Sequence, residues 1–428
     1  MRNPTIDRWF TAFIFLLFIL ANTFFYHNAD GDDLSSSYIA CRLLAQGEKS
    51  HLYSHDPEFF HIVDDPIWTQ TAEDASFHGF LHPYVQIPLW AFSLIPLCQA
   101  VNFQTFNIIF LAINFSAIAA TIWLVCHQWA PAFLAKPIWL LGFLLIFSLT
   151  TPTYYMAFLN QTHPIFLFAT ILAVYLASHK QDMLSGLVLA IAVSVKITPI
   201  VIAFHWLISG RKRSVLSFAV WSGILGILSV LILGAKINLE YLSNLTRISN
   251  VLLVSFNNQS LASWWSGNSY DLSEILYWRM YPLSTPIKLI GVGLILFVAA
   301  YFALLYQRKQ SDPVNLEAIS VSSLLVASTI FTPIAWTHYY IVLLIPLLIL
   351  IDRAVQTKRI WLIFTTLLIV LLNTWPLAIN PLNPQLYPFT ILRSHFYSGI
   401  ICLCALLVYS HASFGKLDLR SALTKKLA

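Results

Sequence analysis

Runs of apolar residues recur from one end of the chain to the other, and most of them are about 15 to 25 residues long. A helix of this length crosses roughly 30 Å of hydrocarbon. Backbone groups in lipid must be hydrogen-bonded internally, and the alternating pattern of a barrel is absent, so the spanning element is a helix. Apolar residues make up 58% of the 428 positions, which leaves too few polar residues to cover a soluble domain. The sequence therefore predicts an all-α polytopic membrane protein.

We expect about twelve spans within a single domain. The outer segments of substance are 28–83, 235–284 and 377–394, and a basic tail follows at 413–428. The expected spans are 9–27, 84–101, 104–126, 137–151, 163–178, 184–208, 214–234, 285–306, 318–332, 338–351, 359–376 and 395–412.

Lysine and arginine gather in five clusters, which predict the orientation of the chain. The clusters fall within 2–8, 211–213, 308–309, 353–359 and 416–426. By the positive-inside rule they are cytoplasmic. Both termini are then inside, and segment 28–83 faces outward, as expected for a multi-pass protein of the plasma (inner) membrane with its active site toward the periplasm. The net charge of +5 comes from these anchors and gives no indication of a nucleic-acid partner.

Segment Asn28–Pro83 holds ten of the nineteen acidic residues, including Asp32 and Asp33 just beyond the first span. Two interpretations stay open for this pair. After Asp30-Gly31 it suits a turn or the N-cap of a helix that begins near Ser35. Alternatively, an aspartate at the interface acts as a general base within reach of an acceptor hydroxyl. Two short surface helices are expected, at 35–45 and 57–63.

Span 184–208 contains Lys196 near its middle, followed by Thr198-Pro199. An ionisable group within a span is a functional hypothesis by default, here neutralisation of a phosphate. The alternative is a structural lysine that snorkels or pairs with a neighbouring helix. Proline removes a helical hydrogen bond, so the segment is either one continuous helix or two half-helices that meet inside the membrane. In the second case Asn160-Gln161 faces outside instead of inside.

The outer loop also contains five histidines, but no ligand pattern around them makes a metal site credible. They are His51, His55, His61, His78 and His82. Cys41 is the only cysteine in this loop, and the other four lie in or at the edge of apolar spans, so no disulfide is expected. Arg247, Arg279 and Arg393 lie on or near the outer side, where each is either a bidentate phosphate clamp or an interfacial anchor.

Several segments, taken in order, resemble glycosyltransferase family 87. Asp33–Tyr53 is similar to the opening of the family after its first helix, and Phe80–Pro96 to its Tyr-Pro-Pro entry, with His82 where a proline is usual. Leu159–Phe168 keeps Gln161 of a Gly-Gln-x-Asn motif, with Asn160 in place of the glycine. The others are Gly186–Ile202, with Lys196 and Pro199; Asn257–Leu261; and Phe331–Leu348, with Pro333, Trp336 and His338 retained and Tyr339 in place of a second histidine.

The resemblance implies a GT-C fold with a large outer first loop and a polyprenyl-phosphate-sugar-dependent hexosyltransferase activity, mannose being the family's donor sugar. Asp33 would be the general base, with Asp32 as a possible second acid. The resemblance assigns the donor phosphate and sugar to Lys196, His338, Gln161, Tyr38 and Asn258. It implies no metal and no cofactor beyond the lipid-linked donor. The partners are the membrane, this donor, and an acceptor glycan or glycolipid.

Two rival classes would also explain the apolar bulk of the chain. A transporter or flippase of lipid-linked sugars accounts for the intramembrane lysine, but not for the acidic outer loop, and no two-fold repeat is visible. A polymerase or ligase of lipid-linked sugars usually carries its large outer loop late in the chain, whereas here the loop follows the first span. The early loop and the order of the motifs favour the transferase.

Overall fold

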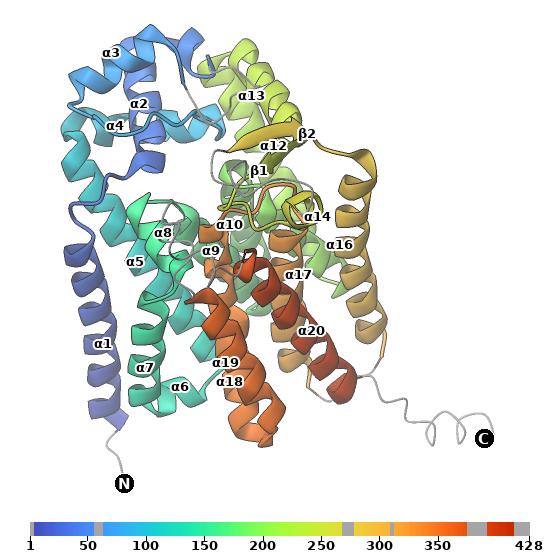
Figure 1. Cartoon of the computed structure of the whole chain (residues 1–428). Helices are drawn as coiled ribbons and strands as arrows, with labels where there is room; N and C mark the ends of the chain where they lie inside the picture. Colours follow the sequence, from blue (N-terminus) through green and yellow to red (C-terminus); the bar gives the residue numbers. More distant parts are fainter. Residues whose placement is uncertain (1–3, 55–62, 268–277, 309–311, 375–391, 415–428) are drawn as a thin grey trace.

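The computed structural model describes residues 4–54, 63–267, 278–308, 312–374 and 392–414, with side chains from Arg8 onward. Figure 1 shows a bundle of helices with a layer of shorter helices at one end. The helices of the first half are α1 (Pro4–Phe25), α2 (Asp32–Gln46), η1 (Lys49–His51), α3 (Pro66–Asp74), α4 (Pro88–Ala100), α5 (Phe103–Gln128), α6 (Ala132–Ala135), α7 (Pro137–Ser148), α8 (Thr151–Phe158), α9 (His163–Ser178), α10 (Asp182–Val195), η3 (Thr198–Ile200) and α11 (Val201–Ile208).

The second half continues the bundle and adds one hairpin. Strands β1 (Val251–Val254) and β2 (Arg279–Pro282) pair antiparallel, with Val251 opposite Pro282. The helices are α12 (Lys212–Leu233), α13 (Ala235–Ile248), α14 (Leu261–Gly267), α16 (Thr285–Tyr306), α17 (Pro313–Ile330), η4 (Thr337–Leu343), α18 (Leu344–Thr357), α19 (Ile360–Asn373) and α20 (Ser394–Phe414). The expected outer segment 377–394, the tail 413–428 and the surface helix 57–63 fall largely outside the described residues.

Within the described part of the chain, seven helices are long and apolar enough to cross a membrane. They are α1, α5, α12, α16, α17, α20 and the continuous run of η4 and α18. An eighth crossing is formed if α7 and α8, which meet at 65°, count as one span. Few side chains of α12 are buried, as expected of a helix that packs on α10 with one side and has much of its surface toward lipid. The prediction of an all-α polytopic membrane protein is confirmed.

Helix α17 lies at the centre of the bundle, where every residue from Asn315 to Ile330 is buried. It packs against α11, α16, α18 and α20. Near its first turn, Arg211 Nη2 lies 2.6 Å from Glu317 Oε2, and this ion pair ties the start of α12 to α17. In Figure 1, α1 begins, α18 turns into α19, and α20 ends at the end of the bundle opposite the short helices.

The expected span 84–101 is wrong. Helix α4 has 13 residues, which is a length of about 20 Å, too short for the hydrocarbon layer. Its sequence is apolar because it packs against α2 instead. Helices α2, α3, α4 and α13 together form the end layer seen in Figure 1, which we call the outer layer.

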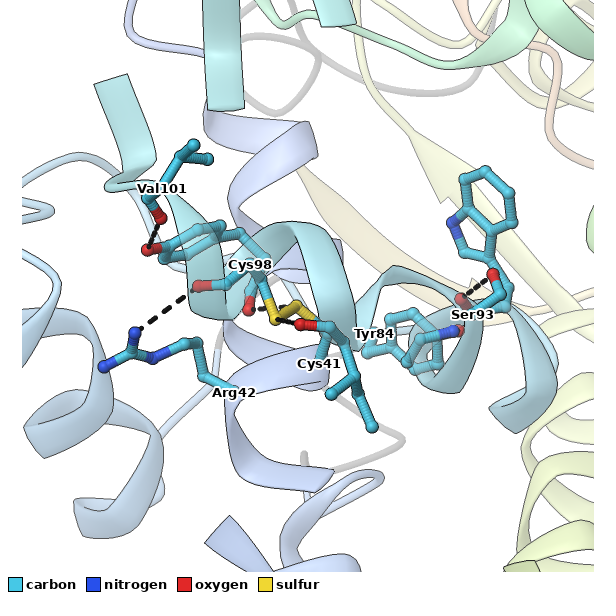
Figure 2. The surroundings of a disulfide bond; sticks show 10 residues. Cys41, Arg42, Tyr84, Ser93, Cys98 and Val101 are labelled. Atoms are coloured by element: carbon cyan, nitrogen blue, oxygen red, sulfur yellow. Dashed lines mark hydrogen bonds between the residues drawn. A yellow bond between two sulfur atoms is a disulfide. The ribbon is translucent and has the colours of Figure 1, made fainter. Parts of the chain in front are cut away.

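The outer layer contains a disulfide between Cys41 of α2 and Cys98 of α4, whose Cα atoms are 6.6 Å apart (Figure 2). The expectation of no disulfide is therefore wrong. Assigning 84–101 to the membrane had placed Cys98 in lipid, whereas α4 brings it to the same layer as Cys41. Next to the bond, Arg42 Nη1 donates to the Cys98 carbonyl at 3.4 Å.

Span 184–208 is broken at Lys196. Helix α10 ends at Val195, Lys196 has extended backbone angles (φ −133°, ψ 124°), and the chain resumes in η3 and α11. Pro199 lies in the first turn of the second piece, where its missing N–H costs nothing. Of the two forms that the sequence allowed, the structure has two half-helices.

Candidate active site

The first turn of α2 carries Asp32 and Asp33, and a glycine fixes where that turn begins. Gly31 has a left-handed φ of 65°, and its N–H donates to the Phe158 carbonyl at 3.2 Å. A Cβ at this position would lie 2.2 Å from Asn107 Oδ1, so only glycine fits. No side-chain cap is formed. The two aspartates are thus helical residues beside the positive end of the helix dipole rather than N-caps.

Asp33 has a partner on each carboxylate oxygen. The Gln161 side-chain amide donates to Oδ2, and His82 Nε2 lies 3.4 Å from Oδ1. Gln161 and Asp33 are 128 positions apart, and His82 comes from the loop that precedes α4. Gln161 therefore lies on the same side of the bundle as the acidic segment, as expected for the half-helix topology.

The position of Gln161 is set by its neighbour Asn160, whose backbone φ of 47° is left-handed. Asparagine tolerates this conformation better than most residues. The Asn160 side chain is buried and donates to Asn107 Oδ1 at 2.7 Å while accepting from Asn114 Nδ2 at 2.8 Å. This network of three amides explains how Asn160 replaces the glycine of the motif.

Lys196 lies at the break between α10 and η3, with Nζ 4.4 Å from the centre of the Tyr339 ring. On the Tyr339 ring, His163 stacks at 5.0 Å and His338 packs edge-on at 4.9 Å. A lysine and two histidines from α9, the broken span and η4 thus converge on one tyrosine ring. His163 links this group to Asp33, because it follows Gln161, the hydrogen-bond partner of Asp33, by two positions.

Both histidines of this group have unused hydrogen-bonding capacity. His338 is 2% exposed, and neither of its ring nitrogens has a partner among the described residues. Nδ1 of the buried His163 is likewise unpaired in the described part of the chain. Buried polar atoms are normally hydrogen-bonded. Unpaired imidazoles beside an ammonium group therefore indicate a site for an anionic or hydroxyl-bearing ligand.

Asp32 is hydrogen-bonded to the loop before α4. Its Oδ1 accepts from the Phe80 backbone N–H at 3.2 Å. A Cβ on Gly79 would approach the same oxygen to 2.3 Å, so the loop before α4 closes tightly over it. Burial raises the pKa of Asp32 above its usual value, against the opposing influence of His82 and the Phe80 amide.

Tyr38 and Asn258 use their polar atoms to hold the fold. Tyr38 is 1% exposed, and its hydroxyl donates to the Val101 carbonyl at 3.0 Å between α2 and α5. Asn258 donates to the Leu253 carbonyl at 2.9 Å and accepts from the Ala335 N–H at 2.9 Å. Asn258 thereby joins the segment after β1 to the start of η4. The structure gives neither residue a contact with Asp33 or Lys196 among its described hydrogen bonds.

The three arginines lie in different surroundings. Arg247 at the end of α13 and Arg279 in β2 are exposed. Arg393 is 5% exposed, and its Nη1 donates to the carbonyls of Ser255 and Asn258, at 2.7 and 3.0 Å. Its Nη2 has no partner within the described residues. Arg393 therefore orders the segment between β1 and α14 through Nη1, and as far as the described residues go its Nη2 is available to a ligand.

No group of three or more potential metal ligands occurs in the described part of the chain. His51 instead lies 2.9 Å from Asp65 Oδ2, an oxygen of the side chain that caps α3. His78 is exposed, and His55 and His61 lie outside the described residues.

Two hollows lie in the outer layer beside α2 and the start of α5. One has a volume of about 440 Å³ and is lined by Arg42, Gln104 and other polar side chains. The second, of about 400 Å³, shares Gln104 and borders Asp30 and His78. Neither is lined by the residues around Asp33 and Lys196.

The sequence singled out Asp33, Gln161, Lys196 and His338, and the structure brings these four together. It adds His82, His163 and Tyr339. For His82 and Tyr339 there was a signal, since both depart from the motifs in which they stand. His163 follows Gln161 by two positions, but nothing in the sequence alone links it to Tyr339.

The model of glycosyltransferase family 87 matches residues 84–333, which is more than half of the chain. No curated protein and no solved structure matches the chain. The matched region includes Gln161, His163 and Lys196, whereas His338 lies just after it and Asp33 lies well before its start.

Proposed function

Because the chain belongs to glycosyltransferase family 87, we propose that it transfers a hexose from a polyprenyl-phosphate carrier to a hydroxyl acceptor at the outer face of the membrane. Mannose is the first donor to test. The observation that carries the proposal is a geometric one. Gln161 holds the Asp33 carboxylate, and His163, two positions further on, stacks on the Tyr339 ring that faces Lys196 at the helix break. An acidic and a basic residue in this arrangement suit a reaction that needs a base for a hydroxyl and a cation for a phosphate.

Asp33 is the proposed general base. The acceptor hydroxyl loses its proton to the carboxylate while its oxygen bonds to the anomeric carbon, through an oxocarbenium-like transition state. The bond between that carbon and the phosphate oxygen breaks, and the phosphate keeps the electron pair. A single displacement inverts the anomeric centre, so a β-linked donor gives an α-glycoside. Gln161 holds Oδ2 and so orients the base.

Lys196, His338 and His163 are the proposed partners of the leaving phosphate. Negative charge grows on this group in the transition state, and preorganised donors stabilise it best when water is excluded. The ammonium group of Lys196 and the unpaired nitrogens of the two histidines supply such donors. The phosphate leaves as an ionised group, so we expect neither a metal nor another cofactor.

The acceptor is proposed to be a glycan or glycolipid. The two hollows of the outer layer support this because amide and carboxyl side chains line them, the groups that hydrogen-bond sugar hydroxyls. The disulfide supports an outward orientation toward an oxidising compartment, since disulfides persist there and are rare in the cytosol. The chain is then a multi-pass protein of the plasma membrane.

One observation favours a second candidate. A broken helix with a buried lysine is also typical of transporters, whose half-helices bind substrate in the middle of the membrane. A flippase of lipid-linked sugars is therefore the second candidate, and a polymerase or ligase of such lipids is the third.

A transfer assay in nanodiscs separates these functions. Radiolabelled polyprenyl-phosphate-mannose and a membrane-lipid extract are incubated with wild type, Asp33→Asn and the matched control Asp32→Asn. We expect label to move to a new product with wild type and Asp32→Asn, and a loss of at least about 100-fold with Asp33→Asn. Loss only in Asp32→Asn would move the base by one residue. Binding without transfer of mannosyl, glucosyl or arabinosyl carriers would favour the flippase.

A further inference from the structure

Among the described residues, His82 is the one titratable side chain that contacts Asp33 and is also partly open to solvent. Its Nε2 lies 3.4 Å from Asp33 Oδ1, and the two side chains are 17% and 19% exposed. The other titratable groups near Asp33 in the described part of the chain are Asp32, the buried His163 and His338, and the half-buried Tyr339 and Lys196. A proton that arrives on Asp33 therefore has a way out through His82.

We propose that His82 is a proton relay for Asp33. The inference rests on the proposed function, in which Asp33 takes the acceptor proton. Oδ2 of Asp33 is occupied by the Gln161 amide, so the incoming proton bonds to Oδ1. It then passes from Oδ1 to the unprotonated Nε2 of a neutral His82 that carries its own proton on Nδ1, which restores the carboxylate and forms an imidazolium. The imidazolium releases the proton to water, and no other reactant is needed.

The surroundings of His82 suit this role. Within the described residues, the charged groups that face it are Asp32 and Asp33, both from the first turn of α2. Two carboxylates favour a transient imidazolium. The Phe80 ring packs at 4.8 Å and limits the rotation of the imidazole.

The relay has a consequence for pH that a structural role lacks. A protonated His82 can no longer accept, and its positive charge makes Asp33 a weaker base, so transfer falls on the acidic side as His82 becomes charged. A glutamine at position 82 can hydrogen-bond to Oδ1 through its amide but cannot carry a proton. We expect His82→Gln to lower kcat about tenfold or more at pH 7.5. We expect the acidic limb of the pH–rate profile of His82→Gln to move to lower pH, and its KM for the donor to stay nearly unchanged.

The test compares the pH profiles of kcat and kcat/KM for wild type, His82→Gln and His411→Gln. His411 is an exposed histidine in the last turn of α20, outside the candidate site and both hollows, so its variant should follow wild type. Thermal unfolding of each variant checks that the fold is kept. A His82→Gln enzyme with wild-type rate, or with a reduced rate but an unshifted acidic limb, would overturn the relay while leaving the transferase intact.

A second readout does not depend on activity. In protein labelled with ¹³C-histidine, the imidazole signal of His82 should change when Asp33→Asn removes the neighbouring charge, whereas that of His78 should not. An unchanged His82 signal would contradict the pair even in a protein that transfers no sugar. Failure of transfer in wild type, with the pair detected, would instead count against the proposed function.

Discussion

Nζ of Lys196 lies 4.4 Å from the centre of the Tyr339 ring, and His163 stacks on the same ring at 5.0 Å. Because the helix breaks at Lys196, this side chain does not follow the direction that a regular helix would give it. The contact with the aromatic ring fixes the position of the ammonium group. The contact joins the broken span to η4, two segments that are more than a hundred positions apart.

We therefore predict that Tyr339→Phe keeps transfer within about twofold of wild type, because a phenyl ring still binds an ammonium group. Tyr339→Leu removes the ring face, and a cation–π contact away from water contributes roughly 2 kcal/mol. We expect kcat to fall about tenfold or more. Initial rates in nanodiscs measure both effects. Equal rates for the two variants would show that the ring does not position Lys196.

A second prediction concerns Asn160. Asn160→Ala must keep a left-handed φ, which costs about 1–2 kcal/mol, and it loses the amide contacts to Asn107 and Asn114 at about 1 kcal/mol each. We expect a lower temperature of unfolding and weaker transfer, since Gln161 loses its support. Asn160→Gly relieves the backbone strain and should recover part of the stability. If glycine and alanine are equally destabilising, the backbone conformation is not the cause.

Much of the site could be predicted because the residue types in the motifs indicate a chemical role even when the three-dimensional arrangement is unknown. Asp33 after the first span, Gln161, and Lys196 beside Pro199 each stood out by residue type and position. Pro199 also indicated the break that the structure has. The all-α architecture could be predicted from hydropathy, because a segment that lies in lipid must be apolar and helical however the helices are arranged.

The remainder depends on tertiary contacts that leave no mark in a hydropathy pattern. An apolar helix that packs against a neighbour in the outer layer looks like a span, so α4 was misassigned and the Cys41–Cys98 bond was missed. The contacts of Asp33 with Gln161 and His82 join three distant segments. One-dimensional spacing cannot show which pairs of residues meet.

The disulfide gives a third prediction. Cys41 and Cys98 are 57 positions apart, and closing a loop of that length stabilises by about 4 kcal/mol in the chain-entropy model. Cys98→Ser should therefore lower the unfolding temperature and make α2–α4 sensitive to protease before the rest of the bundle yields. Cys404→Ser, at an exposed free cysteine, is the matched control. Reducing agent should reproduce the effect in wild type and leave Cys98→Ser unchanged.

The last prediction separates the two adjacent aspartates by pH. The pKa of Asp32 is raised, chiefly by burial, so the folded state holds this proton more tightly than the unfolded state does. The resulting stability is present in full at low pH, below the ordinary pKa of 3.8, and is lost as pH rises through the raised value. At neutral pH the ionised Asp32 therefore destabilises the fold. Asp32→Asn removes this cost and keeps an oxygen that can accept from the Phe80 N–H.

We expect the unfolding temperature of Asp32→Asn to equal or exceed that of wild type at pH 7, with the difference vanishing as the pH is lowered toward 4. Thermal unfolding followed by intrinsic tryptophan fluorescence at several pH values measures this. A clear loss of stability at pH 7 would mean that the charge on Asp32, through His82 or the helix dipole, stabilises the loop more than burial opposes it. Since Asp33→Asn should abolish transfer, the pair then divides into one residue for catalysis and one for closing the loop that holds His82.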